Sequence, residues 1–100
     1  MKNVKLNLFG TEYNCEVLFH KYEEGGGHRI DLIDLEDGIP VATATVNVPG
    51  INLLGNEVVI KDYSENEGVY DALVKQGIIK KTNKSIQLSD YVVAPIATIV

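Results

Sequence analysis

The stretch from Glu57 to Ile79, EVVIKDYSENEGVYDALVKQGII, constrains the fold of this chain more than any other part of it. Its opening run, Val58–Ile60, has the β-branched apolar composition of a buried strand. Polar residues and a glycine-bounded helical pattern follow at once. A strand that leads directly into a helix predicts a mixed α and β architecture.

The helix in this stretch has a predicted start, face and end. Ser64 and Glu67 have capping-box spacing, in which each side chain bonds the backbone N–H of the other, so we expect the helix to begin at Ser64. Gly77 is expected to end it with a positive φ, and Ile78 to fold back on Leu73 as in a Schellman motif. Four residues recur at helical spacing and mark one face of the helix: Val69, Ala72, Leu73 and Gln76.

The first half of the chain alternates apolar and polar residues, which is typical of half-buried strands. Residues 3–9 and a second strand of about ten residues are joined at Gly10-Thr11, which predicts one hairpin. Residues 29–35 and 41–48 are joined at the turn 36–38, which predicts a second hairpin. The alternation slips by one between Leu32 and Ile33, which indicates a β-bulge. These two hairpins predict a meander.

Alternation places the threonines of residues 41–48 on the outer face of their strand. After the helix, Thr82-Asn83 has turn chemistry and residues 85–88 predict a brief strand. Residues 91–100 are β-prone, but Pro95 cannot donate a ladder hydrogen bond, so we expect an edge strand or a bulge there. The predicted fold class is α+β, an antiparallel β-meander of about six strands packed with one amphipathic helix.

Composition places the chain among single-domain globular proteins. Its 100 residues are 45% hydrophobic and 23% charged, so we expect one domain over residues 1–100 with an ordinary core. No apolar run is long enough for a transmembrane helix, and the N-terminus reads as a strand rather than a secretory signal. Cys15 is the only cysteine, which excludes an intramolecular disulfide. We expect a protein of a reducing, bacterial-type cytoplasm.

No residue pattern predicts catalysis. Cys15 lies on the apolar side of its strand and is expected to be a small buried hydrophobe. The glycine loop 25–27 lacks the Lys-Ser/Thr of a phosphate loop, and the acidic run 31–37 lacks the oxygen spacing and glycine of a calcium loop. His20 and His28 flank the glycine loop, but no ligand spacing selects them. We therefore predict a protein that is not an enzyme, with no catalytic residues, no metal site and no cofactor.

Charge distribution gives the strongest indication of a binding surface. The net charge of −5 argues against nucleic-acid or anionic-membrane ligands, which require clustered Lys and Arg. Acidic residues gather in 31–37 and 57–71, whereas 75–84 holds lysines and no acid. Tyrosines accompany the second acidic cluster, as in many protein interfaces, although tyrosine is equally ordinary core material. The predicted partner-binding residues are Asp62, Tyr63, Glu65, Glu67, Tyr70 and Asp71.

Three segments resemble a group of small proteins of bacteriophages, plasmids and conjugative elements with an "IKDWSENEG…APV"-like pattern: IKDYSENEGVYDALVKQGI (60–78), EDGIPVATATVN (36–47) and YVVAPI (91–96). Tyr63 stands where many of these relatives have Trp. The group has no established catalytic residues to carry over. The resemblance implies a mobile-element accessory protein, and small acidic proteins of that origin often inhibit host defence, anti-CRISPR proteins among them.

Two functions remain open at this point. The first is a non-enzymatic inhibitor that binds a host defence protein, with a nucleic-acid-binding CRISPR effector as one candidate, through the acidic face. The alternative is a small-molecule or nucleotide-binding module. In it, the segment KYEEGGGHR (21–29), which contains the glycine loop, and the lysines of 75–84 lie near one pocket. Oligomeric state is left open by the sequence.

Overall fold

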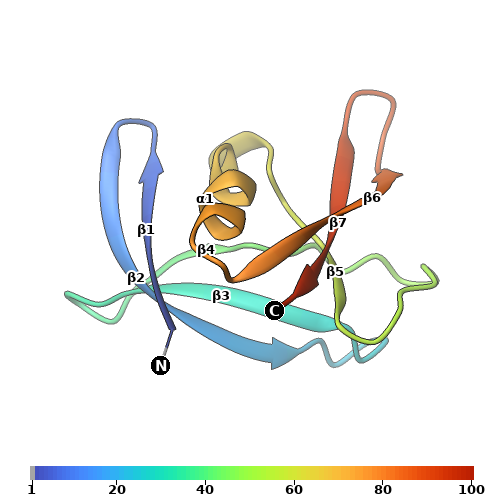
Figure 1. Cartoon of the computed structure of the whole chain (residues 1–100), viewed down its shortest axis with the longest axis horizontal. Coiled ribbons are helices and arrows are strands. Elements are labelled where there is room, and N and C mark those ends of the chain that lie inside the picture. The colour runs from blue at the N-terminus through green and yellow to red at the C-terminus, as the bar shows by residue number, and fades with distance from the viewer. Residues whose placement is uncertain (1) are drawn as a thin grey trace.

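The computed structural model describes residues 2–100. Within them the chain forms seven strands in two antiparallel sheets, one short α-helix and one 3-10 turn (Figure 1). The elements are β1 (Lys2–Leu8), β2 (Thr11–Lys21), β3 (His28–Asp34), β4 (Pro40–Thr43), β5 (Glu57–Val59), η1 (Ser64–Asn66), α1 (Val69–Lys75), β6 (Ile79–Gln87) and β7 (Val93–Ile99). The α+β class is confirmed, but the single six-strand meander is wrong, because the strands divide between two sheets.

The first sheet has the order β1-β2-β3-β4 and contains the two predicted hairpins. Leu8 pairs with Thr11, so the first turn consists of Phe9 and Gly10, one residue earlier than predicted. The second turn contains Gly38 with a φ of 73°, a conformation that favours glycine. The pairing of β3 with β4 shifts register between Leu32 and Ile33, which confirms the predicted bulge.

The second sheet has the order β5-β7-β6, so β7 is a central strand and the edge prediction for residues 91–100 is wrong. Pro95 is tolerated where β5 ends, and its carbonyl accepts a hydrogen bond from the Ile60 N–H at 2.9 Å. On the other side, the register shifts between Lys81 and Ser85, opposite Pro95, so the irregularity lies in the partner strand β6 and not in residues 91–100, where the bulge was predicted. The predicted turn at Thr82-Asn83 is wrong, because both residues belong to β6.

The outer-face prediction for the threonines of residues 41–48 fails at Thr45. The strand β4 ends at Thr43, and Ala44 and Thr45 are both buried, so the alternation breaks there. The Thr45 side chain turns inward, where its Oγ1 lies 2.8 Å from the Tyr22 hydroxyl and accepts the Ile30 N–H at 3.3 Å. Two consecutive buried residues are possible because the chain leaves the first sheet at this point and meets Ile60 by a single bridge.

The helix begins later than the capping box predicts. Ser64 lies in η1 with a φ of 55° and makes no side-chain cap bond, and α1 begins only at Val69, after Gly68. The Asp62 carboxylate takes the capping role, because its Oδ1 accepts the N–H groups of Gly68 at 3.0 Å and Tyr70 at 3.1 Å. The predicted start at Ser64 and its capping box with Glu67 are therefore wrong, and a carboxylate two residues earlier replaces them.

The predicted end of the helix is confirmed. Gly77 has a φ of 76° and donates its N–H to the Val74 carbonyl at 3.1 Å, while Ile78 donates to Leu73 at 2.9 Å. This is the bond pattern of a Schellman motif. The helix buries Val69 and Leu73 completely, and each such side chain stabilises the fold by about 1.5–3 kcal/mol.

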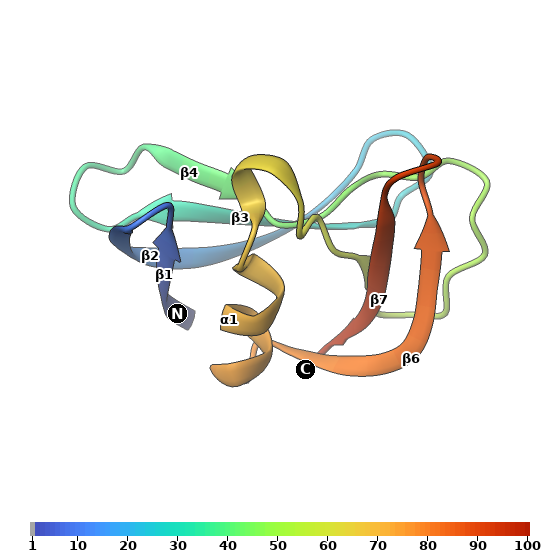
Figure 2. The same ribbon diagram turned by 90° about the horizontal axis from the view of Figure 1, so that it is seen from above.

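The segment 66–76 spans the first sheet from one edge to the other. At the β4 edge, the Asn66 amide donates to the Thr43 carbonyl at 2.7 Å. At the β1 edge, the Gln76 amide accepts the Lys5 N–H and donates to the Lys5 carbonyl, both at 2.8 Å. Figure 2 shows α1 between the first sheet and the strands β6 and β7. The two side-chain amides thus occupy the places that neighbouring strands would take.

One core lies between α1 and the two sheets, and a smaller cluster of Val59, Ala94 and Ile96 lies under the connection between β4 and β5. Fully buried side chains of the main core are Leu6, Cys15, Ile30, Leu32, Val58, Ile60, Val69, Leu73 and Ile79. Within residues 2–100, no helix is long and apolar enough to cross a membrane.

Candidate protein-binding surface

The six predicted partner-binding residues lie on one short segment, residues 62–71, which we call the acidic segment. It begins after β5, includes η1 and ends in the first turn of α1. The structure therefore brings the six residues together, but it gives them different tasks.

One side chain braces the acidic segment internally, and another holds it to the rest of the protein. Asp62 caps α1 through the Gly68 and Tyr70 amides, as described above. Asn66, which is 2% exposed, anchors η1 to the Thr43 carbonyl of β4. Asp62 is thus largely occupied within the fold. Asn66 is absent from the predicted set, although an asparagine between two glutamates at a helix start was the available signal.

Lys61 neutralises part of the acidic segment. Its ammonium forms an ion pair with the Glu65 carboxylate, and the hydrogen bond from Lys61 lowers the pKa of Glu65. The same ammonium lies 5.6 Å from the centre of the Tyr63 ring, within range of a cation–π contact. Glu65 and Tyr63 therefore form a local cluster around one cation, and Glu65 contributes less net negative charge to the surface than the sequence suggests.

Glu67 and Asp71 are the acidic residues of the segment that face solvent without a cation. Both are exposed, and no ion pair within residues 2–100 includes either of them. Tyr70 lies between them in sequence and is partly buried, with the Lys81 ammonium 5.6 Å from its ring centre. Burial, together with the charges of Asp71 and Asp62, raises the pKa of Tyr70, so its hydroxyl stays protonated.

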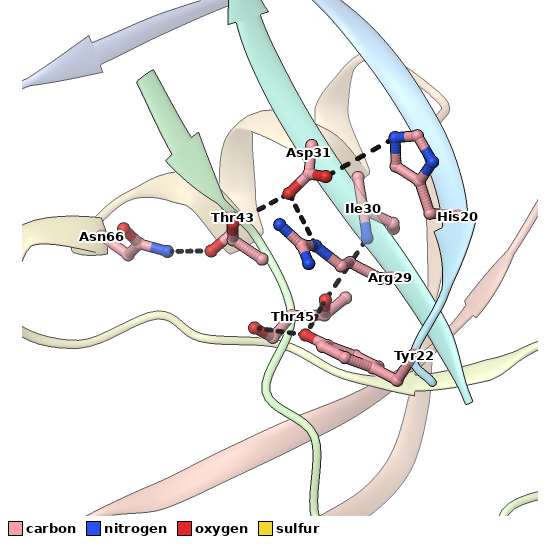
Figure 3. A network of polar contacts seen from close by, with 8 residues as sticks. All are labelled: His20, Tyr22, Arg29, Ile30, Asp31, Thr43, Thr45 and Asn66. Atoms are coloured by element: carbon pink, nitrogen blue, oxygen red, sulfur yellow. Dashed lines mark hydrogen bonds and ion pairs between the residues drawn. The ribbon is translucent and has the colours of Figure 1, made fainter. Parts of the chain in front are cut away.

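The other acidic cluster, residues 31–37, is joined to the acidic segment through Thr43 (Figure 3). The Thr43 hydroxyl donates to Asp31 Oδ1 at 2.8 Å, while its carbonyl accepts the Asn66 amide. Asp31 also receives Arg29 Nε at 3.1 Å and lies 3.6 Å from His20 Nε2. Asp31 is therefore surrounded by donors and is a structural acid rather than a free surface charge.

The remaining acids of that cluster shape the β3–β4 turn. Asp34 accepts the Glu36 N–H at 2.8 Å, and Asp37 accepts the Ile39 N–H at 2.9 Å. His28, on the far side of the glycine loop from His20, bonds the Gly55 carbonyl at 3.0 Å. Within residues 2–100 no three His, Cys, Asp or Glu side chains gather closely enough to hold a metal ion.

The glycine loop lines a hollow of about 250 Å³ together with the connection between β4 and β5. None of the lysines of residues 75–84 lines this hollow, but Glu57 does, and Lys84 is its ion-pair partner. Lys84 is paired with Glu57 at 2.8 Å, and Lys81 covers Tyr70. The small-molecule alternative stays a prediction, with Lys21 as the lysine that lines the hollow.

Cys15 is a core residue, as predicted from its place on the apolar side of β2. It is fully buried, and burial, followed by the nearby charge of Asp34, raises the pKa of its thiol to about 11. Such a thiol is almost entirely protonated near neutral pH, and protonated thiols are poor nucleophiles.

Comparisons of this chain with known protein families, with curated proteins and with solved structures find no match. The resemblance to mobile-element proteins therefore stays a prediction from the sequence.

Proposed function

We propose that this protein is a non-enzymatic binding protein whose acidic segment docks on a basic surface of a partner protein. The observation that carries the proposal is the pair of exposed carboxylates, Glu67 and Asp71, which no cation neutralises. They flank the partly buried Tyr70, whose ring supplies rigid contact area of the kind found in protein interfaces.

The way in which the segment is held favours binding. Asn66 anchors the segment to β4 and Asp62 braces it across the start of α1, so its exposed carboxylates keep their positions in the unbound protein. A preorganised surface loses less conformational entropy when a partner binds. Complementary charge also speeds the encounter with a basic partner and discriminates against acidic ones.

A basic surface is most common on proteins that bind nucleic acids, since these must neutralise phosphates. The resemblance to mobile-element proteins makes a host defence protein of this kind, such as a CRISPR effector, the first partner class to test. In this proposal the acidic segment occupies a positively charged channel and inhibits the partner by excluding nucleic acid. The compartment would be the bacterial cytoplasm.

The test is affinity capture from bacterial lysate, with the captured proteins identified and their charge noted. The site variant is Glu67→Lys with Asp71→Lys. The matched control is Glu23→Lys with Glu24→Lys, which makes the same charge change at two exposed residues just before the glycine loop.

The proposal expects one basic nucleic-acid-binding protein to be retained at low salt and released at about 0.5 M salt. The site variant should lose this protein and the control variant should keep it. Equal capture by wild type, site variant and control would show that the acidic segment is not the binding surface. Asp62 is not a suitable test residue, because its replacement would disturb the start of α1.

A further inference from the structure

The β1–β2 turn carries an exposed aromatic residue in an unusual backbone conformation. Phe9 is 77% exposed and has a φ of 52°, and Gly10 after it has a φ of 83°. Two-residue hairpin turns with both φ values positive favour Asn or Asp followed by Gly. Of residues 2–100, only Phe9 and Ser64 combine a side chain with a positive φ.

A phenylalanine at this position does not serve the fold. A bulky side chain disfavours the left-handed region, where its Cβ crowds the following carbonyl. Its ring gains little from burial, because most of it remains in water. Single exposed apolar residues are common on protein surfaces. Phe9 differs from those residues because a smaller polar residue would be more favourable both in its backbone conformation and in its exposure to water.

Phe9 lies close to the acidic segment. The strand β1 runs beside α1, and a Cβ atom at Gly68 would lie only 3.7 Å from the carbonyl oxygen of Asn7. Asn7 is two residues before Phe9, and Gly68 directly follows Glu67. Figures 1 and 2 both show the β1–β2 turn and the start of α1 on the same side of the molecule.

We propose that Phe9 is the apolar anchor of the acidic interface and inserts into an apolar pocket that basic residues border on the partner protein. This inference rests on the proposed function and adds to it the shape of the partner surface. Aromatic anchors carry a large share of binding energy in protein interfaces, whereas rim charges mainly set association rate and salt dependence. Glu67 and Asp71 would thus steer the partner, and Phe9 would hold it.

The first experiment replaces Phe9 with the photoreactive analogue p-benzoylphenylalanine in cells. The matched control places the analogue at Tyr91, which is 97% exposed in the connection between β6 and β7, on the other sheet. The proposal expects position 9 to crosslink to the same basic protein that the acidic segment captures, and position 91 not to do so. Crosslinking from position 91 alone, or from neither position, would overturn it.

The second experiment separates stability from binding. Phe9→Asn creates an Asn-Gly turn, so we expect the melting temperature to rise by about 4–8 °C. The same variant should bind the captured protein about 30-fold more weakly, and Phe9→Trp should restore most of the affinity. Improved stability combined with lost binding is a result that damage to the fold cannot produce.

The outcomes distinguish this inference from the proposed function. If Glu67→Lys with Asp71→Lys abolishes capture while Phe9→Asn binds like wild type, the acidic segment stands and the anchor is refuted. If neither variant changes capture, both proposals are wrong. If only the Phe9 variant loses the partner, Phe9 contacts it outside an acidic interface, and both the proposed function and the anchor inference as stated are wrong.

Discussion

Replacing Asp62 with alanine should destabilise the protein by about 1–2 kcal/mol. The Asp62 carboxylate accepts two backbone N–H groups, those of Gly68 and Tyr70, at 3.0 and 3.1 Å. Loss of a helix cap generally costs about 0.5–2 kcal/mol, and hydrogen bonds to an ionised acceptor lie in the upper part of that range. In a domain of this size the melting temperature should therefore fall by about 4–16 °C.

Ser64 provides the matched control, because a capping box would assign the same task to its hydroxyl. Ser64→Ala should change the free energy of unfolding by less than about 0.5 kcal/mol, since the hydroxyl makes no cap bond. Ser64→Gly should stabilise the protein by up to about 1 kcal/mol, because Ser64 has a φ of 55°.

The assay is urea unfolding of the three variants and the wild type, monitored by circular dichroism. The curves are analysed with one common m-value, the slope of the free energy of unfolding against urea concentration. The helix signal of the Asp62 variant should also decrease before the main transition, since its first turn has lost the cap. A Ser64→Ala variant as unstable as Asp62→Ala would refute the reasoning, because it would mean that the serine caps the helix in solution.

Two further predictions follow from the titrating groups. In the folded protein, Cys15 should not react with a thiol reagent such as DTNB at about pH 8.5, where an ordinary thiol is half ionised. In denaturant it should react fully. Rapid labelling without denaturant would contradict its buried position. The hydrogen bonds from Lys84 and from the Leu54 N–H lower the pKa of Glu57 from 4.5. The ionised Glu57 therefore stabilises the fold above pH 4.5, and this stabilisation is lost as the pH falls through the lowered pKa. Glu57→Gln should therefore be less stable than wild type at neutral pH and should show a flatter loss of stability below about pH 5; parallel acid-unfolding curves would count against the ion pair.

Local signals in the sequence predicted local structure well. The alternation of apolar and polar residues predicted both hairpins, its slip at Leu32 predicted the bulge, and Gly77 predicted the end of the helix. Each of these features is determined by residues that are neighbours in the chain, so a periodic pattern or one glycine is enough to recognise it. The burial of Cys15 follows from the same alternation.

The errors concern contacts between distant residues. Pro95 suggested an edge strand, and this prediction failed. The sequence does not show that β5 ends beside Pro95 and that β6 bulges opposite it. Ser64 had the right spacing for a cap, but the Asn66 anchor to β4 bends the chain into η1 and leaves the cap to Asp62. Residues 62–71 stay the predicted surface, but the sequence overestimated their free charge, because the partners of Asp62 and Glu65 depend on the fold.

The segment 66–76 gives this protein a built-in reporter for hydrogen exchange. The Lys5 amide hydrogen is held by the Gln76 side chain rather than by another strand, so it exchanges when the helix leaves the edge of β1. Opening of this one segment would uncover both edges of the first sheet at once, without global unfolding. Because the same segment carries Glu67 and Asp71, a bound partner would slow exchange at Lys5, on a strand that it need not touch. In the proposed function, partner binding at the acidic segment would therefore also stabilise the closed edges of the first sheet.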